Sequence, residues 1–123
     1  MHYTVEHLVS GDENIVIHYR NAVAHWKEIW NQPEAKDVAS LASLLSNEQS
    51  WFEHHCGGRW IGQEIMVVSG IGMLYTTKDG FGRDAVKARM LYDAFQQSYC
   101  SIEVKATARD VAVSYGLLEE AAV

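Results

Sequence analysis

The chain has few cysteines and prolines and no long hydrophobic run. One proline and two cysteines among 123 residues exclude a collagen-like chain and a disulfide-stapled scaffold. Cys56 and Cys100 are therefore interpreted as reduced thiols of a cytoplasmic protein. No basic segment followed by an apolar run opens the sequence, so no secretory signal is expected. The longest apolar stretch, residues 65–74, is about half of what a bilayer span needs, and no membrane association is expected.

Positive charge is also scarce. Lys and Arg number 10 against 16 Asp and Glu, which gives a formal net charge of −6. Such a chain repels phosphate backbones at long range, so nucleic acid is not the expected partner. Residues 107–117 are similar to the first helix and turn of helix-turn-helix proteins. The residues that remain, 118–123, are too few and too acidic for a recognition helix, so a truncated DNA-binding factor is a minor hypothesis.

What the chain does have is a share of 48% apolar residues, enough for a core of its own. At 123 residues it has the size of one domain, and residues 1–123 are expected to form a single unit. Helical periodicity predicts helices over residues 15–31, 34–45, 46–55 and 83–99. Pro33 is expected in the first turn of the helix over 34–45, and Asp84 is expected to cap the helix over 83–99. The residues that carry this periodicity are Tyr19, Val23, Trp26, Trp30, Val38, Leu41, Leu44, Leu45, Val86, Met90, Leu91, Ala94 and Phe95.

The remaining segments favour strands. Seven of the nine glycines lie between residues 57 and 82, and the runs 59–69 and 71–77 are β-branched and aromatic, which predicts an antiparallel hairpin. Short strands are expected over residues 3–9 and 102–106, with a last helix capped by Thr107 and Asp110 that ends near residue 121. The predicted fold is α+β, with an antiparallel sheet of about three or four strands packed against amphipathic helices, in the order β-ααα-ββ-α-β-α.

Glu53, His54, His55 and Cys56 form the densest group of potentially reactive side chains. Carboxylate, imidazole and thiol groups bind zinc or activate a thiolate, so this group is a candidate catalytic or metal site. Neighbouring positions on a helix point in different directions, which opposes convergence on a metal. The simpler interpretation is a helix end at which the histidines meet free carbonyls and Cys56 packs as a small hydrophobe.

Tryptophan is abundant, and the net negative charge lies toward the N-terminus, because residues 1–58 carry eight acids and three bases whereas residues 59–123 carry eight acids and seven bases. Tryptophan is enriched at the anchors of protein interfaces as well as in cores. An acidic surface can steer a partner toward such an anchor. The candidate binding residues are therefore Trp26, Trp30, Trp51 and Trp60 with Asp12, Glu13 and Glu28.

One segment resembles a known family. The likeness consists of Gly57-Gly58-Arg59-Trp60, then a hairpin with a Gly-rich bend, then Gly80-Phe81, and then Asp84-Ala85 opening a helix with Leu91-Tyr92-Asp93-Ala94-Phe95. Over residues 57–95 the chain resembles ArdB/KlcA-type antirestriction proteins. That resemblance implies a fold without catalytic residues, carried by phage or plasmids to counter type I restriction enzymes.

Together these observations predict a small acidic inhibitor that acts by non-catalytic binding, without a cofactor. Its expected partner is a host protein or protein complex, with a homodimer as a further possibility. The competing hypothesis is a small enzyme or a ligand- or metal-binding domain that uses the Glu53–Cys56 group.

Overall fold

The computed structural model describes residues 13–75 and 84–118, and this part of the chain forms an all-α domain. Five α-helices and one short 3-10 helix follow one another, and no strand occurs within these two ranges. The predicted α+β fold with an antiparallel sheet is therefore wrong. The elements are α2 (Glu13–Trp30), η1 (Pro33–Lys36), α3 (Val38–His55), α4 (Arg59–Tyr75), α5 (Ala85–Gln97) and α6 (Ile102–Ser114).

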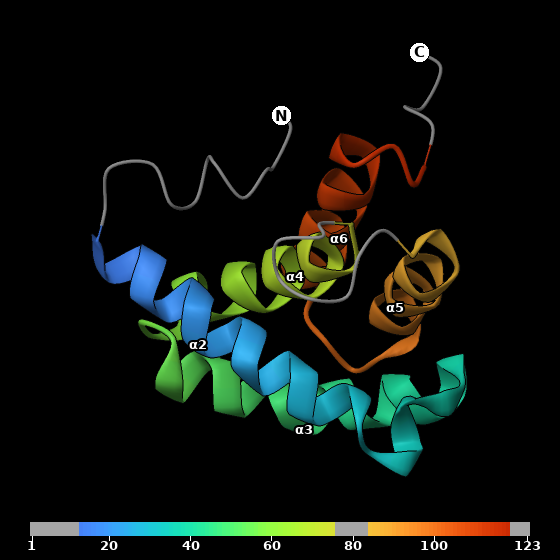
Figure 1. The fold of residues 1–123 in the computed structure, drawn as a ribbon, viewed down its shortest axis with the longest axis horizontal. Coiled ribbons are helices and arrows are strands. Elements are labelled where there is room, and N and C mark those ends of the chain that lie inside the picture. Colours follow the sequence, from blue (N-terminus) through green and yellow to red (C-terminus); the bar gives the residue numbers. More distant parts are fainter. Residues whose placement is uncertain (1–12, 76–83, 119–123) are drawn as a thin grey trace.

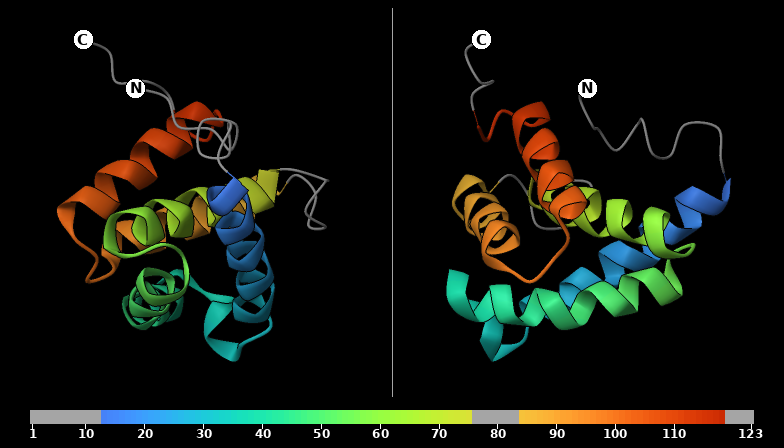
Figure 2. Two further views of the ribbon diagram at one scale, coloured as in Figure 1. Left: turned by 90° about the vertical axis from the view of Figure 1, so that its left-hand side faces the viewer. Right: turned by 180° about the vertical axis from the view of Figure 1, so that it is seen from behind.

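Helix α4 is the centre of the domain. It contacts α2, α3, α5 and α6, and it runs through the middle of the ribbon in every view (Figures 1 and 2). Ile65, Met66, Val67 and Val68 are consecutive and all fully buried. A helix that is apolar all round has to be enclosed by other elements. The domain is thus four helices arranged around a fifth.

The hairpin expected over residues 59–77 is replaced by α4 as far as Tyr75. Gly70, expected at the bend of the hairpin, and Gly62, expected inside its first strand, lie instead where helices approach closely. A Cβ on Gly62 would collide with the backbone carbonyl of Phe52, and one on Gly70 would lie 2.7 Å from the Trp26 ring. A short apolar run rich in β-branched residues has the same pattern in a buried helix as in a buried strand, and this ambiguity produced the error.

The strand expected over residues 102–106 is also wrong, because this segment opens α6. Ser101 caps the helix by accepting a hydrogen bond from the Val104 amide at 3.2 Å. Thr107 lies inside the helix, where its hydroxyl donates to the Glu103 carbonyl at 2.9 Å, so it is not the cap. Val104, Ala108 and Val111 are buried at helical spacing, and this stripe outweighs the short alternation that favoured a strand.

The other predicted helices are confirmed with changed limits. Helix 15–31 is α2, and helix 83–99 is α5, where Asp84 accepts from the Lys87 amide at 3.0 Å as the expected cap. Pro33 begins η1, and the two helices expected over 34–45 and 46–55 are one continuous α3 capped by Asp37. Ser46 does not cap a helix, because its hydroxyl donates to the Ala42 carbonyl and accepts from the Tyr99 amide.

Some expectations fall outside the described residues: the strand over 3–9, the last two residues of the hairpin, 76–77, and the end of the last helix near residue 121. Among the helices that the structure describes, none combines the length and the apolar character needed to cross a membrane.

Candidate functional site

Trp26 lies in the core. It is fully buried, and its indole N–H donates to the Met66 carbonyl and to the Ser69 hydroxyl, both at 3.0 Å. These bonds fasten α2 to the central helix α4. A residue enclosed in this way cannot contact a partner, so Trp26 serves the fold and is not a binding residue.

Trp30 follows Trp26 by one turn of α2 and is partly buried against the core. The ammonium of Lys87 lies 5.9 Å from the centre of its ring, and its indole nitrogen is buried without a hydrogen-bond partner. Of the acids proposed with the tryptophans, Glu13 and Glu28 are exposed at different turns of α2, and Asp12 lies outside the described residues. The structure therefore does not gather these candidates into one patch.

The Glu53–Cys56 group diverges at the end of α3. Cys56 is fully buried with its thiol 3.8 Å from the His18 carbonyl, and burial raises its pKa to about 11. His54 and His55 are exposed, and Glu53 accepts hydrogen bonds from Gln49 and Gln63. Within residues 13–75 and 84–118, no group of three or more His, Cys, Asp or Glu side chains could hold a metal ion. This arrangement offers neither a thiolate at neutral pH nor a set of metal ligands.

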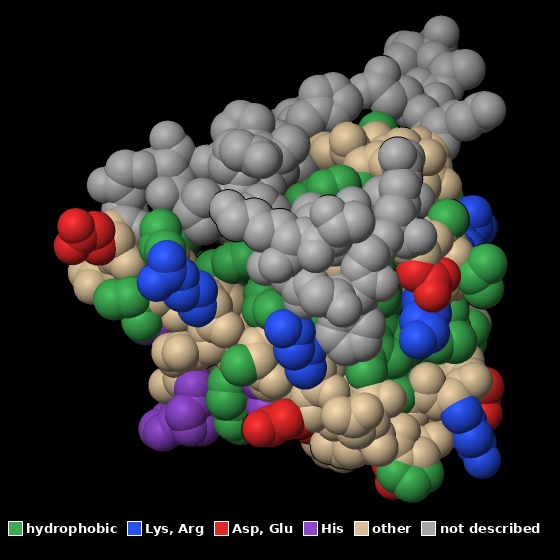
Figure 3. Space-filling view, viewed as in Figure 1, with side chains coloured by type: hydrophobic (Ala, Val, Ile, Leu, Met, Phe, Trp, Pro, Cys, Tyr) green, Lys and Arg blue, Asp and Glu red, His purple; other side chains and the backbone are tan. Residues whose placement is uncertain are grey.

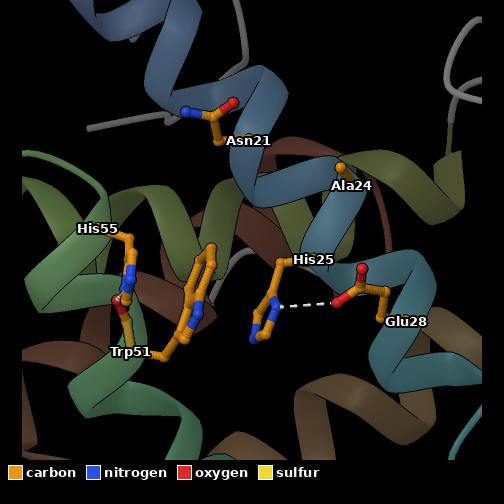
Figure 4. Close-up of a pocket in the computed structure, with 6 residues that line it drawn as sticks. All are labelled: Asn21, Ala24, His25, Glu28, Trp51 and His55. Atoms are coloured by element: carbon orange, nitrogen blue, oxygen red, sulfur yellow. Dashed lines mark hydrogen bonds and ion pairs between the residues drawn. The ribbon is translucent and has the colours of Figure 1, made fainter.

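Two surface hollows contain aromatic and titratable side chains. The first, which we name the Trp51 pocket, lies between α2 and α3 and has a volume of about 340 Å³. Figure 4 shows the rings of His25, Trp51 and His55 stacked one behind another. Histidine side chains gather at the same corner of the molecule in Figure 3. The lining residues are Asn21, Ala24, His25, Glu28, Trp51 and His55.

The polar atoms of the Trp51 pocket are largely paired within the protein. His25 Nε2 bonds the Glu48 carboxylate, and Nδ1 lies 3.6 Å from the Glu28 carboxylate. His55 Nδ1 donates to the Trp51 carbonyl at 2.9 Å, which leaves only its Nε2 toward solvent. Both faces of the Trp51 ring are covered, with ring centres 3.6 Å away at His25 and 4.5 Å away at His55. The lining holds no hydroxyl or thiol, so it offers no nucleophile of these kinds.

The second hollow, which we name the Trp60 groove, lies between the first turns of α4 and α6 and has a volume of about 200 Å³. Seen from behind, α6 crosses α4 (Figure 2). Trp60 is 62% exposed, and the Arg59 guanidinium lies 5.7 Å from the centre of its ring. The groove is lined by Trp60, Gln63, Glu64, Glu103, Val104 and Thr107.

The two carboxylates of the Trp60 groove differ from those of the Trp51 pocket. No hydrogen bond or ion pair joins the side chain of Glu64 or Glu103 to any other residue that the structure describes. Partial burial raises the pKa of Glu64, because the charged form loses water contact without gaining a partner. The groove thus combines an exposed aromatic ring with negative charge that nothing in the described chain neutralises.

A second apolar side chain in the first turn of α4 is also exposed. Ile61 is 40% exposed and follows Trp60 in the first turn of α4. A Cβ on Gly57 would lie 3.1 Å from Ile61 Cγ2 and 3.3 Å from the His18 ring, so these two side chains flank the turn between α3 and α4. Gly57 has a φ of +90°, a conformation that favours glycine and turns the chain sharply from α3 into α4. We name Trp60, Ile61 and His18 the Trp60 surface.

Of the residues in these two hollows, the sequence pointed to Trp51, Trp60, Glu28 and His55 and missed the rest. The signal for Glu64 was the spacing of four from Trp60, which puts the two side chains on one helical face. That signal was hidden because the segment was interpreted as a strand. Nothing in the sequence joins Glu103 to Trp60, or His25 to Trp51, because those pairs come from different helices.

No protein-family model matches the chain, and no curated protein or solved structure matches it. Function therefore has to be inferred from the geometry of the described residues.

Proposed function

We propose that this protein is a non-catalytic protein-binding module of the inhibitor type, and that the Trp60 surface is its binding face. The observation that carries the proposal is the 62% exposure of Trp60 in the first turn of a helix whose residues 65–74 are buried. Tryptophan in water leaves a large apolar area unburied, and tryptophans are over-represented among the residues that dominate binding energy.

The setting of Trp60 supports this role. Helix α4 is held on all sides by other helices, so its first turn presents Trp60 and Ile61 from a rigid base. A side chain fixed to such a base loses little backbone freedom on binding, which leaves more of the contact energy for affinity. Unpaired carboxylates beside the ring add a charge that steers a partner of opposite sign.

The competing enzyme hypothesis has no comparable support. The Cys56 thiol is buried beneath the surface, and its raised pKa opposes a thiolate. Histidine, tryptophan and glutamate do converge in the Trp51 pocket, but they bond mainly to one another and to the backbone. His55 Nε2 remains toward solvent, but no hydroxyl or thiol lines the pocket beside it.

The test is capture of a stoichiometric partner from host lysate by the tagged protein, compared with the variant Trp60→Ala. The resemblance over residues 57–95 makes a type I restriction enzyme the first partner to look for. Val86→Ala is the matched control, because Val86 is 81% exposed in the first turn of α5 and outside the Trp60 surface.

We expect Trp60→Ala to lose the partner and Val86→Ala to keep it. If both variants keep the partner at wild-type yield, or if no partner is captured, the proposal is overturned. Circular dichroism of both variants confirms that the comparison is made between folded proteins.

A further inference from the structure

We propose that the Trp60 groove accepts an arginine side chain of the partner protein, with the guanidinium between the Trp60 ring and the carboxylates of Glu64 and Glu103. This inference rests on the proposed function, because it names the chemistry that the Trp60 surface would recognise. It follows from the two walls of the groove and from what each wall leaves unbonded.

The first wall comes from α4. Trp60 and Glu64 are four residues apart, so the ring and the carboxylate stand one above the other on the same helical face. An indole ring attracts a cation over its face, and a carboxylate accepts hydrogen bonds from it. The guanidinium of Arg59 lies 5.7 Å from the ring centre, so the chain itself already makes one cation contact with this ring, and an incoming guanidinium would add to it or replace it.

The second wall comes from α6. Glu103 and Thr107 are also four residues apart and line the groove opposite α4. The Thr107 hydroxyl donates to the Glu103 backbone carbonyl, so its oxygen remains able to accept a bond from an incoming N–H group. The donor group of Gln63 is turned to Glu53 and Val104 is apolar, so what the two walls offer a planar donor is the Trp60 ring, the two carboxylates and the Thr107 oxygen.

A guanidinium fits these walls better than an ammonium does. It is planar, stacks on aromatic rings and carries five N–H donors in a fixed fork, whereas an ammonium is a compact and strongly hydrated charge. Two carboxylates from different helices call for donors that point in more than one direction. The groove volume of about 200 Å³ accommodates one such side chain and not a folded segment.

The state of Glu64 supports the same conclusion. Its carboxylate is partly withdrawn from water yet has no partner among the described residues, and desolvation raises its pKa. A group held in this way destabilises the free protein, and a bound cation would remove that cost. The formal net charge of −6 adds a long-range attraction for a basic partner.

The experiment uses defined probes and needs no native partner. The ¹⁵N-labelled full chain is titrated with N-acetyl-arginine amide and with N-acetyl-citrulline amide, which has the same shape without the charge. We expect the arginine probe to shift the Trp60 indole signal and the amides around Glu64 and Glu103. The citrulline probe is expected to bind at least about tenfold more weakly.

Two variants locate the site. Glu64→Gln is expected to weaken binding of the arginine probe by about fivefold or more, because it removes one charge-assisted bond. Glu34→Gln removes an exposed acid from η1, far from the groove in sequence and outside its lining, and is expected to leave the affinity unchanged. Equal binding of the two probes, or shifts that avoid the groove, overturns the inference.

The results separate this inference from the proposed function. If the arginine probe fails but Trp60→Ala still loses the captured partner, the surface binds a protein and the arginine assignment is wrong. If the probe binds but Trp60→Ala keeps the partner, the groove is real and the proposed binding face is wrong. If the pure protein elutes as a dimer that Glu64→Gln dissociates, the arginine comes from a second copy, which overturns the assignment to a partner protein.

Discussion

The Trp51 pocket and the Trp60 groove each contain a tryptophan ring and glutamate carboxylates, but the two regions use them in opposite ways. In the pocket, both faces of the Trp51 ring are covered by histidines, and His25 faces the carboxylates of Glu28 and Glu48. In the groove, Trp60 is mostly in water, and Glu64 and Glu103 have no partner among the described residues. Interactions satisfied within the chain stabilise the fold, whereas unsatisfied ones are available to a ligand.

The largest effect that separates the two regions is on stability. We expect Trp51→Ala to lower the free energy of unfolding by about 2–3 kcal/mol, because it removes a partly buried ring and both of its stacking contacts. Trp60→Ala should change it by less than about 0.5 kcal/mol, as exposed substitutions usually do. Urea unfolding of both variants measures the difference, and similar losses in the two would break the comparison.

A smaller difference in stability is expected when one carboxylate is replaced in each region. Glu48→Gln should destabilise the protein by about 1–2 kcal/mol, because it replaces a hydrogen bond between His25 and a largely buried carboxylate by a weaker one. Glu103→Gln should stay within about 0.5 kcal/mol of the wild type. Thermal unfolding at neutral pH is the measurement, and a stable Glu48→Gln variant would show that the pair in the pocket contributes little.

The two regions are also distinguished by the pH dependence of folding stability, to which Glu64 of the Trp60 groove contributes. The pKa of Glu64 is raised in the folded state, so the folded protein retains this proton over a pH window in which the unfolded chain has released it. The contribution of Glu64 to stability is therefore greatest below the unfolded pKa and falls as the pH rises through that window. We expect Glu64→Gln to gain stability relative to the wild type as the pH rises from about 4, near the pKa of glutamate in the unfolded chain, to the pH at which the folded protein has also released the proton. Urea midpoints across this range check the sign, and a constant difference between the two proteins would contradict it.

The smallest effect is expected at Cys56, which lies in the chain between His55 of the pocket and Trp60 of the groove. Its thiol is buried with a pKa raised to about 11, so a thiol reagent at pH 8 should label it only when the protein unfolds. His55→Ala should leave the labelling rate of the folded protein unchanged. Rapid labelling that depends on His55 would instead revive the catalytic hypothesis.

The accuracy of the sequence predictions follows from where each helix lies. Helices α2 and α5 have one buried and one exposed face, so Tyr19, Val23 and Leu91 appear at a helical period that can be recognised without a structure. Helix α4 has apolar residues on every side, so its period is lost, and its glycines and β-branched residues suggest a hairpin. The error at α6 affects fewer residues. The alternation of Ile102, Val104 and Ala106 favoured a strand, although the buried helical stripe in this segment is longer.

The candidate site residues also differ in how far the sequence alone could place them. Trp60 was proposed for binding from its residue type, and its exposure fits that role, while Trp26 was proposed on equal grounds and lies in the core. The helical spacing of Trp26 from Tyr19 and Val23 placed it on the apolar face of α2, whereas the segment around Trp60 was interpreted as a strand, so its exposure was decided by the tertiary structure. The side chains of the Glu53–Cys56 group are adjacent in the chain, but the folded protein places them in different environments.

The sequence by itself determined the acidic charge, the apolar content for one core, and the amphipathic helices α2 and α5 with the Asp84 cap. These are local or compositional properties, and they persist whatever the neighbours are. Only the tertiary structure decided that residues 59–75 form a helix, because close approach at Gly62 and Gly70 and burial on all sides are supplied by the helices around it. The same arrangement brought Glu103 to Trp60, since α4 and α6 meet only when the chain is folded.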